Sequence, residues 1–385
     1  MHIYGHLTGD YALCCHTFSS QVPEEDKFFG KGLSPLEAFN SEYIKKVRLD
    51  MLNGKTPNAC QVCDKFEEAN TVSHRLQVNQ RFHLYSKLFD YTNSDGSVNN
   101  PPFYLDIRFG NLCNFKCRMC GPEASSSWYK DNQKLKIFKS TYDKAVFDPW
   151  TDNEDLWRDV DKIKSHIKLI YFAGGEPFVQ EGHYKLLKFL VDNNCTNIDL
   201  EYNTNLSYDS KFKSYDIEEL WKNFKSIQLW PSIDGYGERA EYGRKGLSWD
   251  LFESNSKRFT NYINTFSIVN NIYSVSSIPE LIRWIKSQNK TFYITNLTNP
   301  PHQSVTVLSK SVKDKIISKY KDLLYGLNLN NDEARIIINA IKYLKSADDS
   351  HLAFKFKDQN SKLDLLRNES FSATFPEFDE WYNNI

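Results

Sequence analysis

Cys113, Cys117 and Cys120 lie in one short stretch of the chain, with the spacing C-x3-C-x2-C. Cysteine thiolates are the usual protein ligands of iron–sulfur clusters, so three of them in one loop can bind three irons of a single [4Fe–4S] cube. The fourth iron of such a cube would have no protein ligand and would be open to a substrate or cosubstrate. The spacing therefore predicts an iron–sulfur site with one open coordination position.

Two other roles fit these cysteines less well. A structural zinc site has four Cys or His ligands in total, whereas this stretch contains three cysteines and no nearby histidine. Three clustered cysteines cannot all pair as disulfides, and nothing in the sequence marks the chain as secreted. An iron–sulfur cluster is the interpretation that the spacing favours.

Composition limits the broad class of the protein. The chain has 385 residues and a net charge of −1, with basic and acidic residues interspersed, which argues against nucleic acid or a membrane surface as a partner. The first residues show no signal peptide, and no apolar run approaches the roughly 18 residues of a membrane span. Eight cysteines in such a chain favour a cytoplasmic protein in which thiols bind metals.

The stretch 105–120, LDIRFGNLCNFKCRMC, begins as an extended run and ends in the three cysteines. It resembles the radical SAM superfamily, in which a C-x3-C-x2-C loop follows the first strand of a barrel. The resemblance implies that S-adenosylmethionine (SAM) binds the open iron through its amine and carboxylate. Met119 stands where the family commonly has an aromatic residue that packs on the adenine, and its thioether can fill that place.

Two further motifs follow later extended segments. Residues Gly174, Gly175, Glu176 and Pro177 form a GGEP sequence similar to the family's "GGE" signature, whose peptide groups would hydrogen-bond the methionine ammonium of SAM. Residues 231–235, PSIDG, are similar to the "S-x-D-G" element. There Ser232 would contact the SAM carboxylate or ribose, and Asp234 would shape the turn.

Two polar residues complete the expected cofactor site. Arg244 is a candidate clamp for a carboxylate, because a guanidinium can meet both oxygens at once. Asn203 belongs to a polar row that alternates with apolar residues along the third predicted strand, which suggests a lined site. A surface arginine and a solvated strand edge are the alternatives for these two residues.

Strand-like and helix-like stretches alternate after residue 100, which predicts βα units and a parallel sheet. The expected strands are 103–109, 167–172, 198–204, 226–233, 266–275 and 291–296. Six such units match the partial (β/α)6 barrel of the radical SAM family, an α/β fold. Right-handed crossovers would place all the strand ends that carry motifs on one face.

The segment before the barrel contains two cysteine pairs, Cys14/Cys15 and the CxxC knuckle Cys60/Cys63. It resembles the twitch half-domain, related to SPASM domains, which in many radical SAM enzymes holds an auxiliary [4Fe–4S] cluster. A zinc knuckle is the alternative. Adjacent cysteines are awkward as joint ligands, which leaves open that one of Cys14 and Cys15 only packs. His6 and His16 are possible substitute ligands, although they are interpreted as surface residues.

A helix is expected between the two cysteine pairs. Ser34 can cap it, Pro35 suits its first position, and Glu37 completes a capping box. Apolar residues at helical spacing continue to Met51, and Gly54 supplies the stop.

The domain organisation follows from these segments. We expect a twitch-like domain over residues 1–98, a radical SAM partial barrel over 99–300 and a C-terminal helical flank over 301–385. Within the flank, the apolar spacing predicts amphipathic helices at 312–327 and 332–347. The aromatic residues beyond them are expected to form a packed flank.

The resemblance implies an enzyme of the oxidoreductase or maturase type. A flavodoxin or ferredoxin-type reductant would supply an electron, SAM would yield methionine and a 5′-deoxyadenosyl radical, and the radical would abstract a hydrogen atom from the substrate. Twitch and SPASM family members often modify peptides or proteins, which favours such a substrate over a small molecule or sugar. The alternatives are a non-catalytic iron–sulfur sensor or partner-binding protein and a zinc-binding structural protein.

Overall fold

The computed structural model describes residues 2–18, 22–68, 73–138, 144–207 and 211–385. Its largest sheet has the strand order β2-β1-β3-β4-β5-β8, and all neighbours in it are parallel except β1 and β2. The strands are β1 (His2–Gly5), β2 (Tyr11–Ala12), β3 (Tyr104–Ile107), β4 (Leu169–Phe172), β5 (Asp199–Thr204) and β8 (Ser226–Pro231).

Two further parallel strands, β9 (Thr265–Asn270) and β10 (Thr291–Asn296), follow β8. Parallel bridges join Leu229 to Ile263 and Ser232 to Ser267, so β9 lies beside β8. Each of the six strands expected from the sequence is therefore present, in chain order and parallel. The α/β class with a central parallel sheet is confirmed, while the closure of these strands into a partial barrel stays a prediction.

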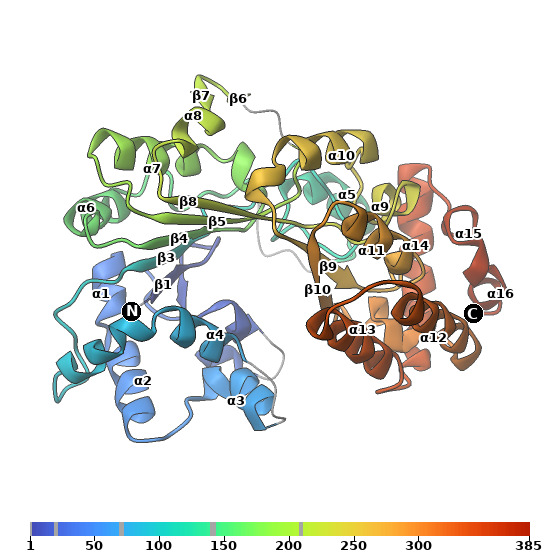
Figure 1. Ribbon diagram of the computed structural model, residues 1–385, viewed down its shortest axis with the longest axis horizontal. Coiled ribbons are helices and arrows are strands. Elements are labelled where there is room, and N and C mark those ends of the chain that lie inside the picture. The colour runs from blue at the N-terminus through green and yellow to red at the C-terminus, as the bar shows by residue number, and fades with distance from the viewer. Residues whose placement is uncertain (1, 19–21, 69–72, 139–143, 208–210) are drawn as a thin grey trace.

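Helices lie on both sides of this sheet. In Figure 1, α6, α7, α8 and α10 lie on one side of the strands, and α2, α3 and α4 lie on the other. On the first side lie α6 (Glu154–Ile163), α7 (Glu181–Asp192), α8 (Ile217–Trp221) and α10 (Trp249–Arg258), while α11 (Ile278–Ser287) follows β9 along the chain. The smaller elements are α5 (Tyr129–Leu135), α9 (Glu238–Gly243), and the short hairpin of β6 (Lys211–Phe212) with β7 (Tyr215–Asp216).

The two faces of the sheet differ in polarity. Along β5, Leu200 and Tyr202 are fully buried, whereas Glu201 and Asn203 on the opposite face are half-buried. The same alternation recurs along β9. Successive residues of a strand point to opposite faces, so the helices cover an apolar face and a polar face remains partly open.

The N-terminal segment is tied to this sheet. Its first strand, β1, pairs in parallel with β3, and a turn at Gly9 leads into β2. The capping box of Ser34 and Glu37 is confirmed at the start of α1 (Pro35–Phe39). The single long helix expected there is wrong, because the side chain of Ser41 accepts a hydrogen bond from the Ile44 N–H and starts a new helix, α2 (Glu42–Leu52).

The rest of this segment is also helical. It contains α3 (Gln61–Glu68), which includes the knuckle cysteine Cys63, and α4 (His74–Arg81). Residues 69–72 between them lie outside the described part of the chain. The domain boundaries proposed after residues 98 and 300 remain predictions.

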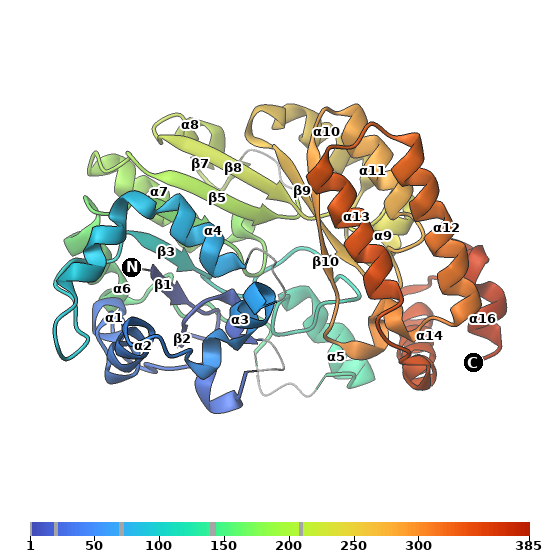
Figure 2. The same cartoon turned by 60° about the horizontal axis from the view of Figure 1, so that its bottom comes forward.

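The C-terminal flank is helical, as Figure 2 shows. Both amphipathic helices are confirmed as α12 (Lys310–Gly326) and α13 (Asn331–Leu344). They are followed by α14 (Ala353–Arg367), α15 (Phe371–Thr374) and α16 (Asp379–Asn383). Phe356, Phe371, Phe375 and Phe378 are buried, so the expected aromatic packing is confirmed, with Phe354 exposed as the exception. Across the described residues, no helix combines the length and the apolar character needed to span a bilayer.

His183 makes the fold sensitive to acid. Its ring is fully buried on α7, and its Nε2 meets the Tyr202 hydroxyl at 3.0 Å. Burial lowers the pKa of His183 from 6.5 to about 3, so below pH 6.5 the unfolded chain binds a proton that the folded chain does not. The free energy of unfolding should therefore fall as the pH drops from 6.5 towards 3.

The contribution of His183 can be measured with His183→Gln, which cannot titrate. Between pH 6.5 and about pH 5.5 the wild-type chain should lose about 1 kcal/mol more unfolding free energy than the variant. Urea unfolding at the two pH values measures this difference. Equal losses in both proteins would show that His183 does not titrate in this way.

Candidate active site

The cysteine loop, residues 112–120, follows β3 and is fixed by its backbone. The carbonyl of Cys113 accepts a hydrogen bond from the Ser127 hydroxyl at 2.7 Å, and the carbonyl of Cys117 accepts one from the Trp128 indole at 2.7 Å. Trp128 is completely buried, so water does not compete for this bond. The loop is therefore anchored to the segment that enters α5.

The three thiols form the donor set. Cys117 is buried, and Cys113 and Cys120 are half-buried. A hydrogen bond between the thiols of Cys117 and Cys120 lowers the pKa of Cys117 and raises the pKa of Cys120.

Within the described residues, no three His, Cys, Asp or Glu side chains converge closely enough to bind one metal ion. A [4Fe–4S] cube does not require such convergence, because each thiolate binds a different iron. The three thiols belong to one anchored loop, and that donor set suits a cube in which each iron takes one thiolate.

The GGEP turn packs directly on this loop. The Glu176 N–H donates to the Leu112 carbonyl at 2.9 Å. Gly175 has a φ of +46°, and a Cβ there would lie 2.3 Å from the same carbonyl oxygen. A Cβ on Gly174 would lie 2.9 Å from the Cβ of Arg108. Both positions therefore need glycine because the cysteine loop and the end of β3 press against them.

The Glu176 carboxylate connects the turn to β5. It accepts hydrogen bonds from the Thr204 hydroxyl at 2.8 Å and from the Asn205 N–H at 2.7 Å. Burial raises the pKa of Glu176 to about 7. Pro177 is buried beside it at the start of a short 3-10 helix. These hydrogen bonds hold the GGEP turn against the end of β5.

Asn205, just after the end of β5, adds a link to the cysteine loop. Its side-chain amide donates to the Asn114 side chain, inside the cysteine loop, at 2.8 Å. The polar row on the third strand was the sequence signal for this region, but the pairing with Asn114 needs the fold. Asn203, two residues earlier on the same face, is half-buried and makes no hydrogen bond through its side chain to any described residue.

Asp234 and Arg244 form a buried ion pair. The Nε of Arg244 donates to the Asp234 carboxylate at 2.8 Å, and the other oxygen of Asp234 accepts from the Val269 N–H at 2.8 Å. Arg244 is 8% exposed, so it is not a surface arginine. Its guanidinium also favours the thiolate form of Cys117 and contributes to the lowered pKa of that thiol.

Ser232 and Met119 are half-buried. The Ser232 N–H donates a hydrogen bond at 2.8 Å to the carbonyl of Thr204, the last residue of β5. The structure thus connects the GGEP turn, the end of β5 and the Asp234–Arg244 pair to the cysteine loop. Contact of any of these residues with SAM stays a prediction.

The N-terminal cysteines fall into two environments. Burial and, to a smaller extent, the thiols of Cys63 and Cys60 raise the pKa of Cys14 to about 11. Burial and, to a smaller extent, the Cys14 thiol raise the pKa of Cys15 to about 12. Cys14 is half-buried and Cys15 is exposed, and which of the two would bind a metal stays a prediction.

The two histidines considered as substitute ligands also differ. His6 is buried, and its Nδ1 meets the Thr8 hydroxyl at 2.8 Å, so its interpretation as a surface residue is wrong. The reason is that β1 lies within the sheet, which carries the segment after it into the interior. His16 is half-buried, with its ring 5.4 Å from that of His74.

Comparison with known proteins gives matches by structure alone. No family model matches the chain, and no curated protein matches it by sequence. One similar solved structure is described as His6-tagged anSMEcpe with bound AdoMet. It is 19% identical, with a TM-score of 0.39, over 59% of this chain and 62% of that one.

A second similar structure is Streptococcus suis SuiB bound to precursor peptide SuiA. It is 15% identical, with a TM-score of 0.36, over 79% of this chain and 66% of that one. The chain thus spans less than two thirds of the length of either protein. The proposed function rests on the residues of the site.

Proposed function

We propose that this chain is a radical SAM enzyme. The observation that carries the proposal is the packing of the GGEP turn on the cysteine loop, with the Glu176 N–H bonded to the Leu112 carbonyl at 2.9 Å. Residues far apart in the sequence meet at the ends of β3 and β4, which is where parallel α/β folds place their chemistry. A protein that only held a cluster would not need this second motif beside its cysteines.

A cluster and SAM bound here would supply one reaction. One electron from a flavodoxin or ferredoxin-type reductant would break the C5′–S bond of SAM, giving methionine and a 5′-deoxyadenosyl radical that takes a hydrogen atom from the substrate. Cys113, Cys117 and Cys120 would each hold one iron. The peptide groups of the half-buried Gly174 and Gly175 and the Ser232 hydroxyl are the groups proposed to bind SAM. The chain's part is to orient these groups and to exclude water.

The partly open face of the sheet is proposed to receive the substrate. It contains Asn203 on β5 and Gln228 and Trp230 on β8, all half-buried, whereas Glu201 is paired with Arg81 of α4. The Trp230 indole N–H is buried and has no hydrogen-bond partner among the described residues. A polar and aromatic surface across several strands suits an extended peptide or a protein segment. A small molecule or sugar is the alternative substrate class.

Reductive cleavage of SAM tests the proposal. Anaerobically reconstituted protein with dithionite and SAM should form 5′-deoxyadenosine without any substrate. A brown protein that binds iron and leaves SAM intact would instead be an iron–sulfur sensor or partner-binding protein. A colourless protein that contains zinc would be structural.

The iron content should distinguish the role of Cys14 from that of Cys15. If Cys14, Cys60 and Cys63 hold an auxiliary [4Fe–4S] cluster, wild-type protein should contain about eight irons, four per cube. Cys14→Ala should reduce this to about four, because its thiol is proposed to bind the same cube as the knuckle thiols. Cys15→Ala is the matched control and should keep about eight. Iron and zinc analysis of the purified proteins gives the measurement.

Two other results would contradict this assignment. Wild-type protein with about four irons and one zinc would make the N-terminal segment a structural knuckle. Equal loss of iron from Cys14→Ala and Cys15→Ala would remove the distinction between the two cysteines.

A further inference from the structure

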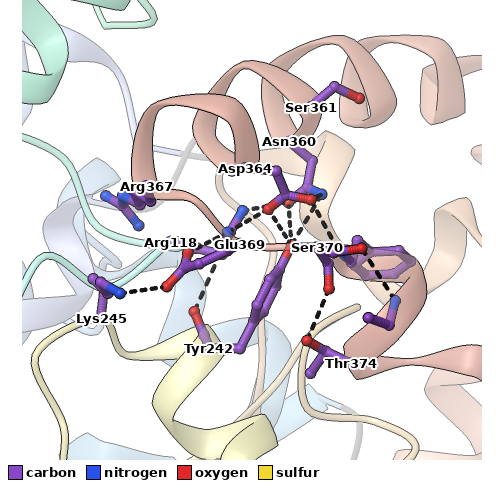
Figure 3. Close-up of polar contacts among 12 residues, drawn as sticks. Arg118, Tyr242, Lys245, Asn360, Ser361, Asp364, Arg367, Glu369, Ser370 and Thr374 are labelled. Atoms are coloured by element: carbon purple, nitrogen blue, oxygen red, sulfur yellow. Dashed lines mark hydrogen bonds and ion pairs between the residues drawn. The ribbon is translucent and has the colours of Figure 1, made fainter.

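Arg118 lies between two of the loop cysteines, and its side chain is completely buried. Its guanidinium donates to Asn360 at 2.7 Å, to Asp364 at 2.5 Å and to Glu369 at 2.6 Å. All three partners belong to α14 or the turn that follows it, as Figure 3 shows. A residue of the cysteine loop is therefore bound by a segment more than 240 positions later in the chain.

The remaining contacts of Arg118 fix its orientation. Its Nε donates to the Tyr242 carbonyl at 3.2 Å, and its guanidinium carbon lies 3.7 Å from the centre of the Tyr242 ring. The Tyr242 hydroxyl donates to Asp364 at 2.7 Å. Arg118 is thus held on one face by an aromatic ring and at its edge by oxygen acceptors, the arrangement for which a planar guanidinium is suited.

Further ion pairs support the same connection. Lys245 pairs with Glu369 at 2.8 Å, and its carbonyl accepts from the Lys116 N–H in the cysteine loop at 2.9 Å. Asp131 pairs with Lys116 at 3.0 Å and with Arg367 at 2.9 Å. The loop is therefore joined to the C-terminal segment at Arg118 and, through Asp131, at Lys116.

We propose that Asn360, Asp364 and Glu369 form a C-terminal clamp that sets the conformation of the Cys117–Cys120 half of the loop, with Arg118 as the positioning residue. What the loop holds rests on the proposed function, whereas the clamp is a property of the polypeptide. Buried charges that lose a partner are costly, so the loop and the clamp should hold one relative position. The C-terminal flank would then help to position the cysteines of the loop.

Hydrogen exchange of the full-length, metal-free, reduced chain tests the clamp. In Asp364→Asn, which weakens the bonds of Arg118 and Tyr242 together, amides of residues 113–120 should exchange at least about tenfold faster, which corresponds to about 1.4 kcal/mol. The matched control is Asp358→Asn, the same change at a half-exposed ion pair with Lys362 on the same helix. The control should leave exchange in the loop unchanged.

A second pair of variants keeps the test valid if one protein folds poorly. Glu369→Gln is a milder change that should accelerate loop exchange less than Asp364→Asn. Lys286→Met breaks the ion pair with buried Glu333, between α11 and α13, and should accelerate exchange there and leave the loop as it is. Unchanged loop exchange in folded Asp364→Asn, or an equal increase throughout the chain, would overturn the clamp.

The spectrum of the reconstituted cluster provides an independent test of the clamp. After reconstitution and reduction, the electron paramagnetic resonance spectrum of Glu369→Gln should differ from that of wild type, while Asp358→Asn should match wild type. Identical spectra for all three proteins would overturn the role of the clamp at the cluster. Wild-type protein that takes up no iron would defeat the proposed function, and the exchange results would still decide whether the clamp exists.

Discussion

Replacing Cys113, Cys117 and Cys120 together by alanine is expected to reduce 5′-deoxyadenosine formation to the background of the reagents. The reason is that the loop would lose all three thiolates proposed to bind iron, so SAM would have no metal to bind. The substitution removes side chains and leaves the backbone anchors of the loop, at Ser127 and Trp128, in place. Chromatographic measurement of 5′-deoxyadenosine after reaction with dithionite gives the result.

Cys195→Ala is the control for this experiment. Cys195 is half-buried after α7, and its thiol contacts the Asn193 carbonyl at 3.4 Å and not the cysteine loop. This variant should form 5′-deoxyadenosine at the wild-type rate. Continued cleavage of SAM by the triple variant would contradict the assignment of the loop as the site of the reaction.

Gly175→Val is expected to cause the second large loss, of both iron and SAM binding. A Cβ at this position would lie 2.3 Å from the Leu112 carbonyl oxygen and 2.7 Å from the Gln180 side chain. The Leu112 oxygen belongs to the backbone and cannot rotate away, so the turn and the cysteine loop must separate. The positive φ of +46° adds a cost of about 1–2 kcal/mol for a residue with a Cβ. Iron content and equilibrium dialysis with labelled SAM measure the two losses.

A second glycine separates the clash from the backbone cost. Gly54, after α2, has a φ of +71°, and a Cβ there would meet no atom within 4 Å. Gly54→Val should therefore lose stability through its φ alone and keep wild-type iron content and SAM affinity. If Gly175→Val also keeps both, the close packing of the GGEP turn on the loop does not support the site.

The elements that could be predicted from the sequence are those specified by a few neighbouring residues. The six strands were found because alternation and bounding turn residues are properties of a few neighbouring residues. The capping box at Ser34 was found for the same reason. The break before α2 was missed, although Ser41 carries its own capping signal, because the apolar spacing continues through it and suggests one helix.

The cysteine spacing and the GGEP sequence were likewise local and could be interpreted before any fold was known. What the sequence could not decide is which groups these motifs contact. Gly175 fits because the Leu112 carbonyl lies against it, and the Glu176 carboxylate is bound by the end of β5. These contacts depend on which strands are neighbours, which parallel pairing sets across long stretches of sequence.

Tertiary structure alone brought the C-terminal segment to Arg118. The sequence places Arg118 in a loop, where a charged side chain is ordinarily exposed. In the folded chain it is fully buried, because Asp364 and Glu369 near the C-terminus neutralise its charge. A buried charge requires partners, and only the folded chain supplies them.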